Sequence, residues 1–179
     1  VANVQTSRLV EEIAHGYGCE FHAAPVGEIN VVEKMIEFDA MIGGEGNCGG
    51  VIYRRVHPGR DSFCAMALIL ERLAFSERKL SEIVADFPPI ANLSCRFALP
   101  PIRSRALLAE MTRRYRQYDP LTFDGLRFDL PEGRVLMRSS NTEPLLRLNV
   151  ECADRRAAEA LLERFRAEIQ QLIEEAAGT

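Results

Sequence analysis

The chain has 179 residues, of which 22 are basic, 26 are acidic and 47 % are hydrophobic, and its formal net charge is −4. A chain of this length and apolar content can form one large domain or two small ones, each with its own core. The acidic balance argues against a nucleic-acid-binding protein, because such domains usually carry a basic stripe. The charge balance does not exclude the binding of small phosphorylated ligands, since these need only a few hydrogen-bond donors at one place.

The cysteines and the ends of the chain bear on where the protein works. The five cysteines are widely spread and form no C-x-x-C pair, which is typical of free thiols in a reducing cytosol. The sequence shows neither a signal-peptide pattern nor an apolar run long enough to cross a membrane. We therefore expect a cytoplasmic protein with no membrane partner. Because the chain opens on a strand-like run at Val1 without an initiator Met, we also expect it to be part of a longer protein.

The first half alternates between helical and extended patterns, which predicts an α/β layer domain over residues 1–87. Helical spacing of apolar residues is found at 6–17, 31–36 and 63–73, and strand-like runs at 19–24, 39–42 and 51–53. Either Thr6 or Ser7 can cap the first helix, and Asp61 can cap the third. Residues 63–73 are apolar nearly all round, which is typical of a helix packed on several sides.

The second half begins after the break at Phe87-Pro88-Pro89 and has a different order of elements. Strands are expected at 91–99, 121–123 with 126–128, 134–137 and 145–151, and helices at 101–118 and from Asp154 onwards. In the last helix, one stripe carries Ala157, Leu161, Phe165, Ile169 and Leu172. This βαβββα order predicts a small α+β domain over residues 91–179, with an antiparallel sheet and its helices on one face.

A glycine-rich stretch at residues 41–53, MIGGEGNCGGVIY, is the first candidate site. Its spacing Gly44-x-Gly46-x-x-Gly49 matches a dinucleotide fingerprint, but that motif requires a helix after the glycines. A strand-like run follows instead, and no Lys-Ser/Thr of a P-loop is present. We therefore expect a hairpin-like loop with Glu45 and Asn47 at its tip. A carboxylate and an amide together suit a sugar diol, although a plain glycine turn with a solvated glutamate fits the same letters.

The second candidate site is a polar turn near the end of the chain. A strand leads Arg138 into the run Ser139-Ser140-Asn141-Thr142, and Pro144 ends the turn. Arginine offers a planar fork of donors, and hydroxyls and turn amides add more, so the turn suits a phosphate group. A polar turn without a ligand is the alternative. Arg147 lies on the next strand, where it can face outward, pair with an acid or support the turn.

Taken together, Gly43-Gly44-Glu45-Gly46-Asn47 and the later Arg138-x-Ser140-Asn141-Thr142-Glu143-Pro144 resemble the α-D-phosphohexomutase superfamily, which includes phosphomannomutase/phosphoglucomutase and phosphoglucosamine mutase. The resemblance covers the whole chain and implies that it corresponds to domains 3 and 4 of a four-domain enzyme. Domain 4 of that family has a fold like that of the TATA-box-binding protein. It assigns sugar binding to Gly44, Glu45, Gly46 and Asn47, and phosphate binding to Arg138, Ser140, Asn141, Thr142 and Arg147. Cys48 departs from the family pattern.

For the longer parent, the resemblance implies phosphate transfer between O1 and O6 of a hexose phosphate through a phosphoserine and a bisphosphate intermediate. Mg²⁺ and a hexose bisphosphate activator are the implied cofactors. The chain contains neither a Ser-His-Asn run nor an Asp-Gly-Asp-x-Asp-Arg run. We therefore expect domains 1 and 2 of the parent as its partners and expect this chain to be inactive alone. A non-catalytic sugar-phosphate-binding module is the alternative, and the preferred hexose stays open.

Overall fold

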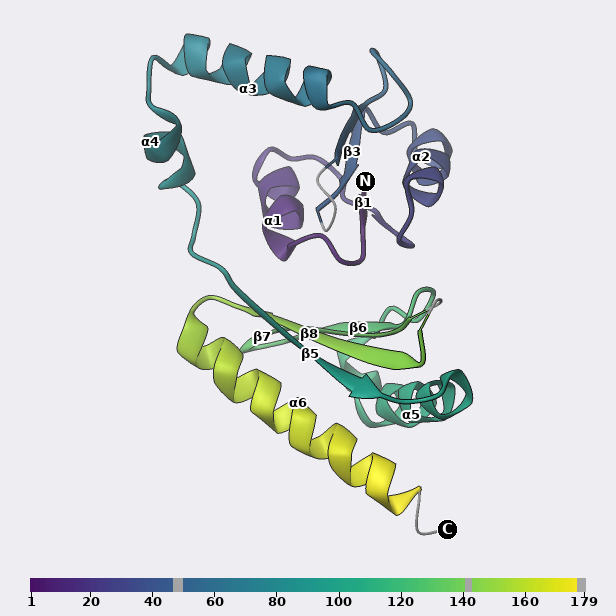
Figure 1. The fold of residues 1–179 in the computed structure, drawn as a ribbon. Helices are drawn as coiled ribbons and strands as arrows, with labels where there is room; N and C mark the ends of the chain where they lie inside the picture. Colours follow the sequence, from purple (N-terminus) through teal and green to yellow (C-terminus); the bar gives the residue numbers. More distant parts are fainter. Residues whose placement is uncertain (47–49, 141–142, 177–179) are drawn as a thin grey trace. The chain divides into compact units, whose positions relative to one another are not determined.

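The computed structural model describes residues 1–46, 50–140 and 143–176. The chain divides into two compact units, residues 1–88 and 89–179 (Figure 1). The first unit mixes strands and helices, and the second has an antiparallel sheet with helices, so the predicted fold class is confirmed. Among the described residues, no helix is long and apolar enough to cross a membrane.

The first unit is built on a mixed four-stranded sheet. Its elements are β1 (Ala2–Asn3), α1 (Arg8–Gly16), β2 (Ala23–Ala24), α2 (Glu28–Glu37), β3 (Ile42–Glu45), β4 (Gly50–Tyr53), α3 (Ser62–Ser76) and α4 (Leu80–Val84). The strand order is β2-β1-β3-β4, with β1 parallel to β2 and β3, and β3 antiparallel to β4. The buried core of this unit consists of Ala24, Val31, Met35 and Ile52.

Two helices of the first unit begin where the sequence predicts a cap. Ser7 precedes α1, and its side chain accepts a hydrogen bond from the amide of Leu9. Asp61 precedes α3 and accepts from the amides of Phe63 and Cys64. These oxygens satisfy amide groups that have no partner within the helix, and this fixes the start of each helix.

Two predicted strands of the first unit are wrong in their bounds. The strand expected at 19–24 is reduced to β2, because only Ala23 and Ala24 have ladder partners on β1. The strand expected at 39–42 lies later, as β3. Asp39 adopts a left-handed backbone with φ 51°, which turns the chain after α2 and delays the extended segment.

The expectation that residues 63–73 pack on several sides is also wrong. In α3, Cys64 is buried, whereas Phe63, Met66 and Leu70 are 81 %, 50 % and 64 % exposed. The helix contacts β4 and then runs on beyond the strands of its own unit (Figure 1). Hydrophobicity on all sides of a helix indicates a tendency to be buried, but it does not supply the surfaces that would bury it.

The second unit is a four-stranded antiparallel sheet in the order β5-β8-β7-β6. Its elements are β5 (Ala91–Ala98), α5 (Pro101–Arg114), a 3₁₀ turn (Arg116–Tyr118), β6 (Leu126–Leu130), β7 (Gly133–Ser139), β8 (Leu145–Cys152) and α6 (Arg155–Glu175). The expected strand at 121–123 is only a single bridge between Leu121 and Arg127. Apart from that strand, the elements follow the predicted βαβββα order, which is confirmed.

Both long helices of the second unit pack on one face of the sheet. The shared core includes Leu107 and Met111 from α5, Leu161, Phe165 and Ile169 from α6, and Phe97, Met137, Leu146 and Leu148 from the strands. The apolar stripe predicted for the last helix is thus confirmed. Because side chains alternate along a strand, the residues between these core positions lie on the face that the helices do not cover.

Candidate functional site

The described residues of the glycine-rich stretch include two antiparallel strands, β3 and β4. Glu45 is the last residue of β3 and pairs with Gly50, the first residue of β4. A Cβ on Gly44 would lie 2.5 Å from the carbonyl oxygen of Gly50, so only glycine fits at that position. The element after the glycines is a strand, β4, whereas a dinucleotide-binding motif needs a helix there. This agrees with the rejection of a dinucleotide site from the sequence.

The Glu45 side chain is buried rather than placed at an open tip. Its residue is 3 % exposed, so the interpretation of a solvated glutamate is wrong. Its Oε1 accepts hydrogen bonds from Asn3 Nδ2 at 2.8 Å and from the Gly27 amide at 2.7 Å. Its Oε2 lies 3.5 Å from Arg60 Nη1. A carboxylate buried with charge-assisted partners has a defined position and orientation.

A polar network around Asn3 connects the end of β1 to the end of β3. Asn3 is fully buried, and its Oδ1 accepts from the Thr6 hydroxyl at 2.9 Å and from the Gln5 amide at 3.1 Å. The Thr6 hydroxyl in turn accepts from the Gly46 amide at 3.0 Å. Sequence reasoning missed Asn3 and Thr6 as parts of the site. The parallel pairing of β1 and β3, which the sequence alone does not give, brings the carboxyl ends of both strands to one edge.

Arg60 connects this network to the first turn of α2. Its Nε donates to Glu28 Oε2 at 2.8 Å and its amide donates to Glu28 Oε1 at 3.0 Å. The side-chain and backbone hydrogen bonds from Arg60 hold the pKa of Glu28 below its ordinary value. Arg60 therefore lies between two carboxylates, those of Glu28 and Glu45, and its contact with Glu45 is the longer one.

Four residues singled out by the sequence lie outside the described residues. They are Asn47 and Cys48 in the glycine-rich stretch and Asn141 and Thr142 in the polar turn. Their assignments stay predictions.

The polar turn of the second unit is held by an aspartate that sequence reasoning missed. Arg138 lies near the end of β7, and its Nε donates to Asp124 Oδ1 at 2.7 Å. Gly125 has φ 86°, and a Cβ there would lie 2.4 Å from the Met137 carbonyl oxygen. The Asp-Gly pair therefore makes a close turn against β7, and this turn places the carboxylate beside the guanidinium. An Asp-Gly dipeptide is a recognisable turn signal in a sequence.

Ser140 and Arg147 make contacts on either side of the turn. The Ser140 hydroxyl accepts from the Glu143 amide at 3.3 Å, and its own amide donates to the Leu145 carbonyl oxygen at 2.8 Å. Arg147 Nη2 lies 3.4 Å from Glu143 Oε2, which agrees with the acid-partner interpretation of this arginine. The described part of the turn is thus closed by its own backbone and by side chains on β8.

Strand pairing places Arg147 between two other arginines. It lies opposite Arg138 on β7 and opposite Arg96 on β5. Arg96 was not singled out from the sequence, because its relation to Arg147 depends on a register that the letters alone do not give.

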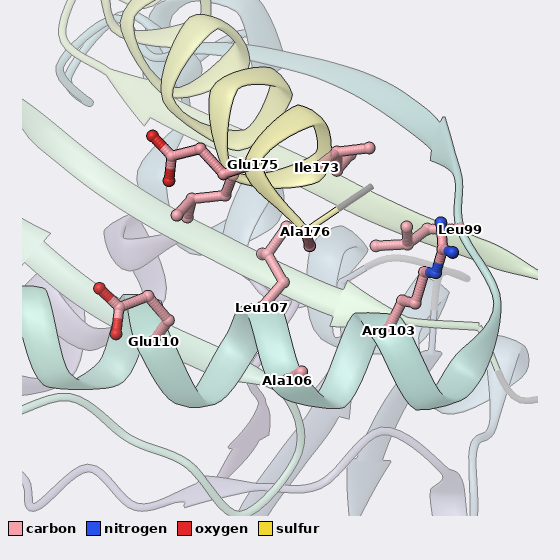
Figure 2. A pocket seen from close by; sticks show the side chains of 9 residues that line it. Leu99, Arg103, Ala106, Leu107, Glu110, Ile173, Glu175 and Ala176 are labelled. Carbon is pink, nitrogen blue, oxygen red and sulfur yellow. The ribbon is translucent and has the colours of Figure 1, made fainter. Parts of the chain in front are cut away.

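An apolar pocket lies elsewhere in the second unit, between α5 and the end of α6 (Figure 2). It is lined by Leu99, Arg103, Ala106, Leu107, Glu110, Leu172, Ile173, Glu175 and Ala176. These residues come from the helix-covered side of the sheet and include none of the predicted site residues. Across the described ranges, no group of three or more His, Cys, Asp or Glu side chains is placed to hold a metal ion.

Comparison with protein families matches both halves of the chain. Residues 1–90 match the model of phosphoglucomutase/phosphomannomutase, alpha/beta/alpha domain III, and residues 76–168 match that of the phosphoglucomutase/phosphomannomutase C-terminal domain. Phosphoglucosamine mutase from Methanocaldococcus jannaschii is 32 % identical over 167 residues, which are 92 % of this chain and 37 % of that protein. The chain therefore spans little more than a third of this relative.

Solved structures show the same relationship. A phosphoglucomutase/phosphomannomutase family protein from Burkholderia thailandensis matches 98 % of this chain and 37 % of its own, with a TM-score of 0.74 and 26 % identity. N-acetylphosphoglucosamine mutase from Aspergillus fumigatus, in complex with GlcNAc-6P and magnesium, matches 98 % of this chain and 39 % of its own, with a TM-score of 0.58. At 17 % identity, the second likeness concerns the fold alone.

Proposed function

Because the chain belongs to the phosphoglucomutase/phosphomannomutase family, we propose that it is the substrate-recognition half of a longer cytoplasmic phosphohexomutase. The longer enzyme interconverts hexose 1-phosphate and hexose 6-phosphate through a phosphoserine and a bisphosphate intermediate. This half binds the sugar and the phosphate that is not reacting. Alone it is inactive, since the serine and metal loops belong to upstream domains.

The observation that carries the proposal is the buried, fully positioned carboxylate of Glu45. With Asn3 and Gly27 holding one oxygen, the other faces Arg60 at 3.5 Å. A long contact to a partly exposed arginine is the one most readily exchanged for sugar hydroxyls. Asn47 and the backbone of Gly44 and Gly46 complete the proposed sugar site.

The proposed phosphate site is the turn after β7. Arg138, Ser140, Asn141 and Thr142 supply its donors, and Arg147 supports them from β8. Asp124 keeps the Arg138 guanidinium in place before a phosphate arrives, which lowers the ordering cost of binding. Charge-assisted hydrogen bonds contribute roughly 1.5–3 kcal/mol each, so a few convergent donors hold a phosphate at useful affinity.

Such a pair of sites suits a reaction in which the bisphosphate intermediate reverses its orientation in the enzyme. A carboxylate accepts a pair of equatorial hydroxyls in either orientation, and a donor-rich turn binds either terminal phosphate. Both sites therefore position the substrate without taking part in bond breaking. Mg²⁺ does not fit the described residues, which offer no cluster of ligands. In this proposal the metal, the phosphoserine and the bisphosphate activator all act in the upstream domains.

Enzyme kinetics on the longer protein test the proposal. Arg138→Ala is expected to raise KM for the hexose phosphate at least about tenfold, the equivalent of roughly 1.4 kcal/mol. Arg156→Ala, which removes an exposed arginine from α6, serves as the control and is expected to leave KM unchanged. An unchanged KM for Arg138→Ala would remove Arg138 as a phosphate ligand. Interconversion of hexose phosphates by the 179-residue chain alone would refute the proposal that this half only binds the substrate while upstream domains carry out the chemistry.

A second candidate function is a non-catalytic module that binds sugar phosphates. It uses the same two proposed sites, because Glu45 with its hydrogen-bond network and the turn after β7 bind and position a ligand without taking part in bond breaking. The coding sequence upstream of Val1 distinguishes the two. A serine loop and an acidic metal loop there identify an enzyme, and their absence identifies a module.

A further inference from the structure

Three arginines lie in register across the sheet of the second unit. Arg96 on β5 pairs with Arg147 on β8, and Arg147 pairs with Arg138 on β7. Cross-strand partners have their side chains on the same face of a sheet, and neighbouring strands lie about 4.8 Å apart. The adjacent residues Phe97 and Leu146 belong to the core under the helices. The arginine row, defined as Arg96, Arg147 and Arg138, therefore lies on the face that the helices leave uncovered.

Like charges placed directly opposite each other destabilise a sheet unless something offsets them. Arg138 has Asp124 at 2.7 Å, and Arg147 has Glu143 at 3.4 Å, a distance at the edge of hydrogen bonding. For Arg96, no ion pair with any of the described residues is found, and the residue is exposed. The row thus carries more positive charge than its neighbouring carboxylates balance.

The central arginine has a donor without an acceptor. Arg147 Nε is buried and has no hydrogen-bond partner among the described residues, although its side chain as a whole is 38 % exposed. A buried donor of a charged group that lacks an acceptor is costly. An anion bound over the exposed part of the row would offset the repulsion between the arginines.

We propose that Arg96 joins Arg147 and Arg138, which already belong to the proposed phosphate site, in binding the phosphate of the sugar phosphate, and that the arginine row selects the dianionic form of a phosphate monoester. This inference rests on the proposed function, because it takes the turn after β7 as the phosphate site. It adds Arg96, which lies on a strand far from the turn in sequence, as a binding residue. A row of three guanidinium groups favours two negative charges over one by Coulomb attraction.

Calorimetric titration of the 179-residue chain with glucose 6-phosphate, at pH 5.5 and pH 8, tests the inference. The second pKa of a phosphate monoester is about 6, so the dianion dominates only at the higher pH. We expect tighter binding at pH 8 in the wild-type chain. Arg96→Gln is expected to weaken binding about fivefold to tenfold at pH 8 and to flatten the difference between the two pH values. Arg147→Lys, which keeps the charge but loses the planar fork, is expected to weaken binding by a similar factor.

Arg156→Gln is the matched control, because it removes one exposed positive charge from α6 without touching the row. Glucose 6-sulfate, which stays a monoanion over this range, is the control ligand and is expected to bind equally weakly at both pH values. If Arg96→Gln binds glucose 6-phosphate like Arg156→Gln while Arg138→Ala abolishes binding, the proposed role of the arginine row is refuted. The turn after β7 is then still supported as the phosphate site. If the row variants weaken the binding of inorganic phosphate, but glucose 6-phosphate binds no better than phosphate, the row stands and the proposed sugar site is refuted.

Discussion

Replacement of Asn3 by alanine tests whether the network around Glu45 holds the first unit together. Asn3 is fully buried and donates to the Glu45 carboxylate at 2.8 Å. Its Oδ1 accepts from the Thr6 hydroxyl and from the Gln5 amide. Alanine removes these three hydrogen bonds and leaves their partners inside the protein, where water does not readily replace the lost group.

The expected cost follows from these contacts. The hydrogen bond to the buried carboxylate contributes about 1.5–3 kcal/mol, and the two neutral ones about 1 kcal/mol each. We therefore expect Asn3→Ala to lower the free energy of unfolding of the first unit by about 3.5–5 kcal/mol. This is a large fraction of the roughly 5–15 kcal/mol typical of a domain.

Hydrogen–deuterium exchange read by mass spectrometry, in increasing urea, provides the assay because it reports on peptides of each unit separately. Peptides that contain β1 and β3 are expected to lose protection at lower urea, while peptides of β7 and β8 are unchanged. Asn92→Ala, an exposed asparagine at the start of β5, is the control and is expected to shift nothing by more than about 0.5 kcal/mol. A loss below about 1 kcal/mol for Asn3→Ala would refute the reasoning, because a fully connected buried network cannot be removed at so small a cost.

Three further predictions concern other parts of the chain. Leu70→Glu on α3 is expected to change the free energy of unfolding of this chain by less than about 0.5 kcal/mol, since Leu70 is 64 % exposed, and urea unfolding checks this. Cys19 is exposed, whereas burial raises the pKa of the Cys95 thiol, so iodoacetamide at pH 8 is expected to alkylate Cys19 before Cys95. Mass mapping that finds Cys95 alkylated faster would contradict the structure. Hydrogen bonds from Arg60 lower the pKa of Glu28 in the folded state, so the stability advantage of wild type over Glu28→Gln is expected in full above about pH 4.5, the ordinary value, and to shrink as the pH falls below it. Equal midpoints for the two proteins at pH 7 would remove that pair as a stabilising contact.

Local sequence patterns predicted the elements whose determinants are local. Asp61 and Ser7 cap the helices they were expected to cap, because a cap depends on neighbours two or three residues away. The strand bounds before β3 were wrong, because a strand exists only where another strand pairs with it. The same limit applies to α3, whose apolar sequence was read correctly but whose surroundings depend on the rest of the fold.

The candidate site divides in a similar way. Glu45 and Arg138 were singled out from the sequence because each lies in a run with an unusual composition, and their binding roles stay predictions. Asn3 and Arg96 were missed because their importance comes from register and parallel pairing, which connect residues over 40 positions apart in the chain. A single sequence carries no direct record of those pairings. In the sequence alone, nothing distinguishes Asn3 from any other polar residue near the end of a chain.

The network around Glu45 also connects the folding of the first unit to ligand binding. Its members come from four separate stretches of the chain, at residues 3–6, 27–28, 45–46 and 60. These stretches approach one another only when the whole sheet has formed, so the proposed sugar site is absent from any partly folded chain. A ligand that binds there stabilises the complete first unit, by about 2.7 kcal/mol at a concentration one hundred times its Kd. A rise in the melting temperature of that unit alone would therefore identify the sugar that fits, before any catalytic activity is measured.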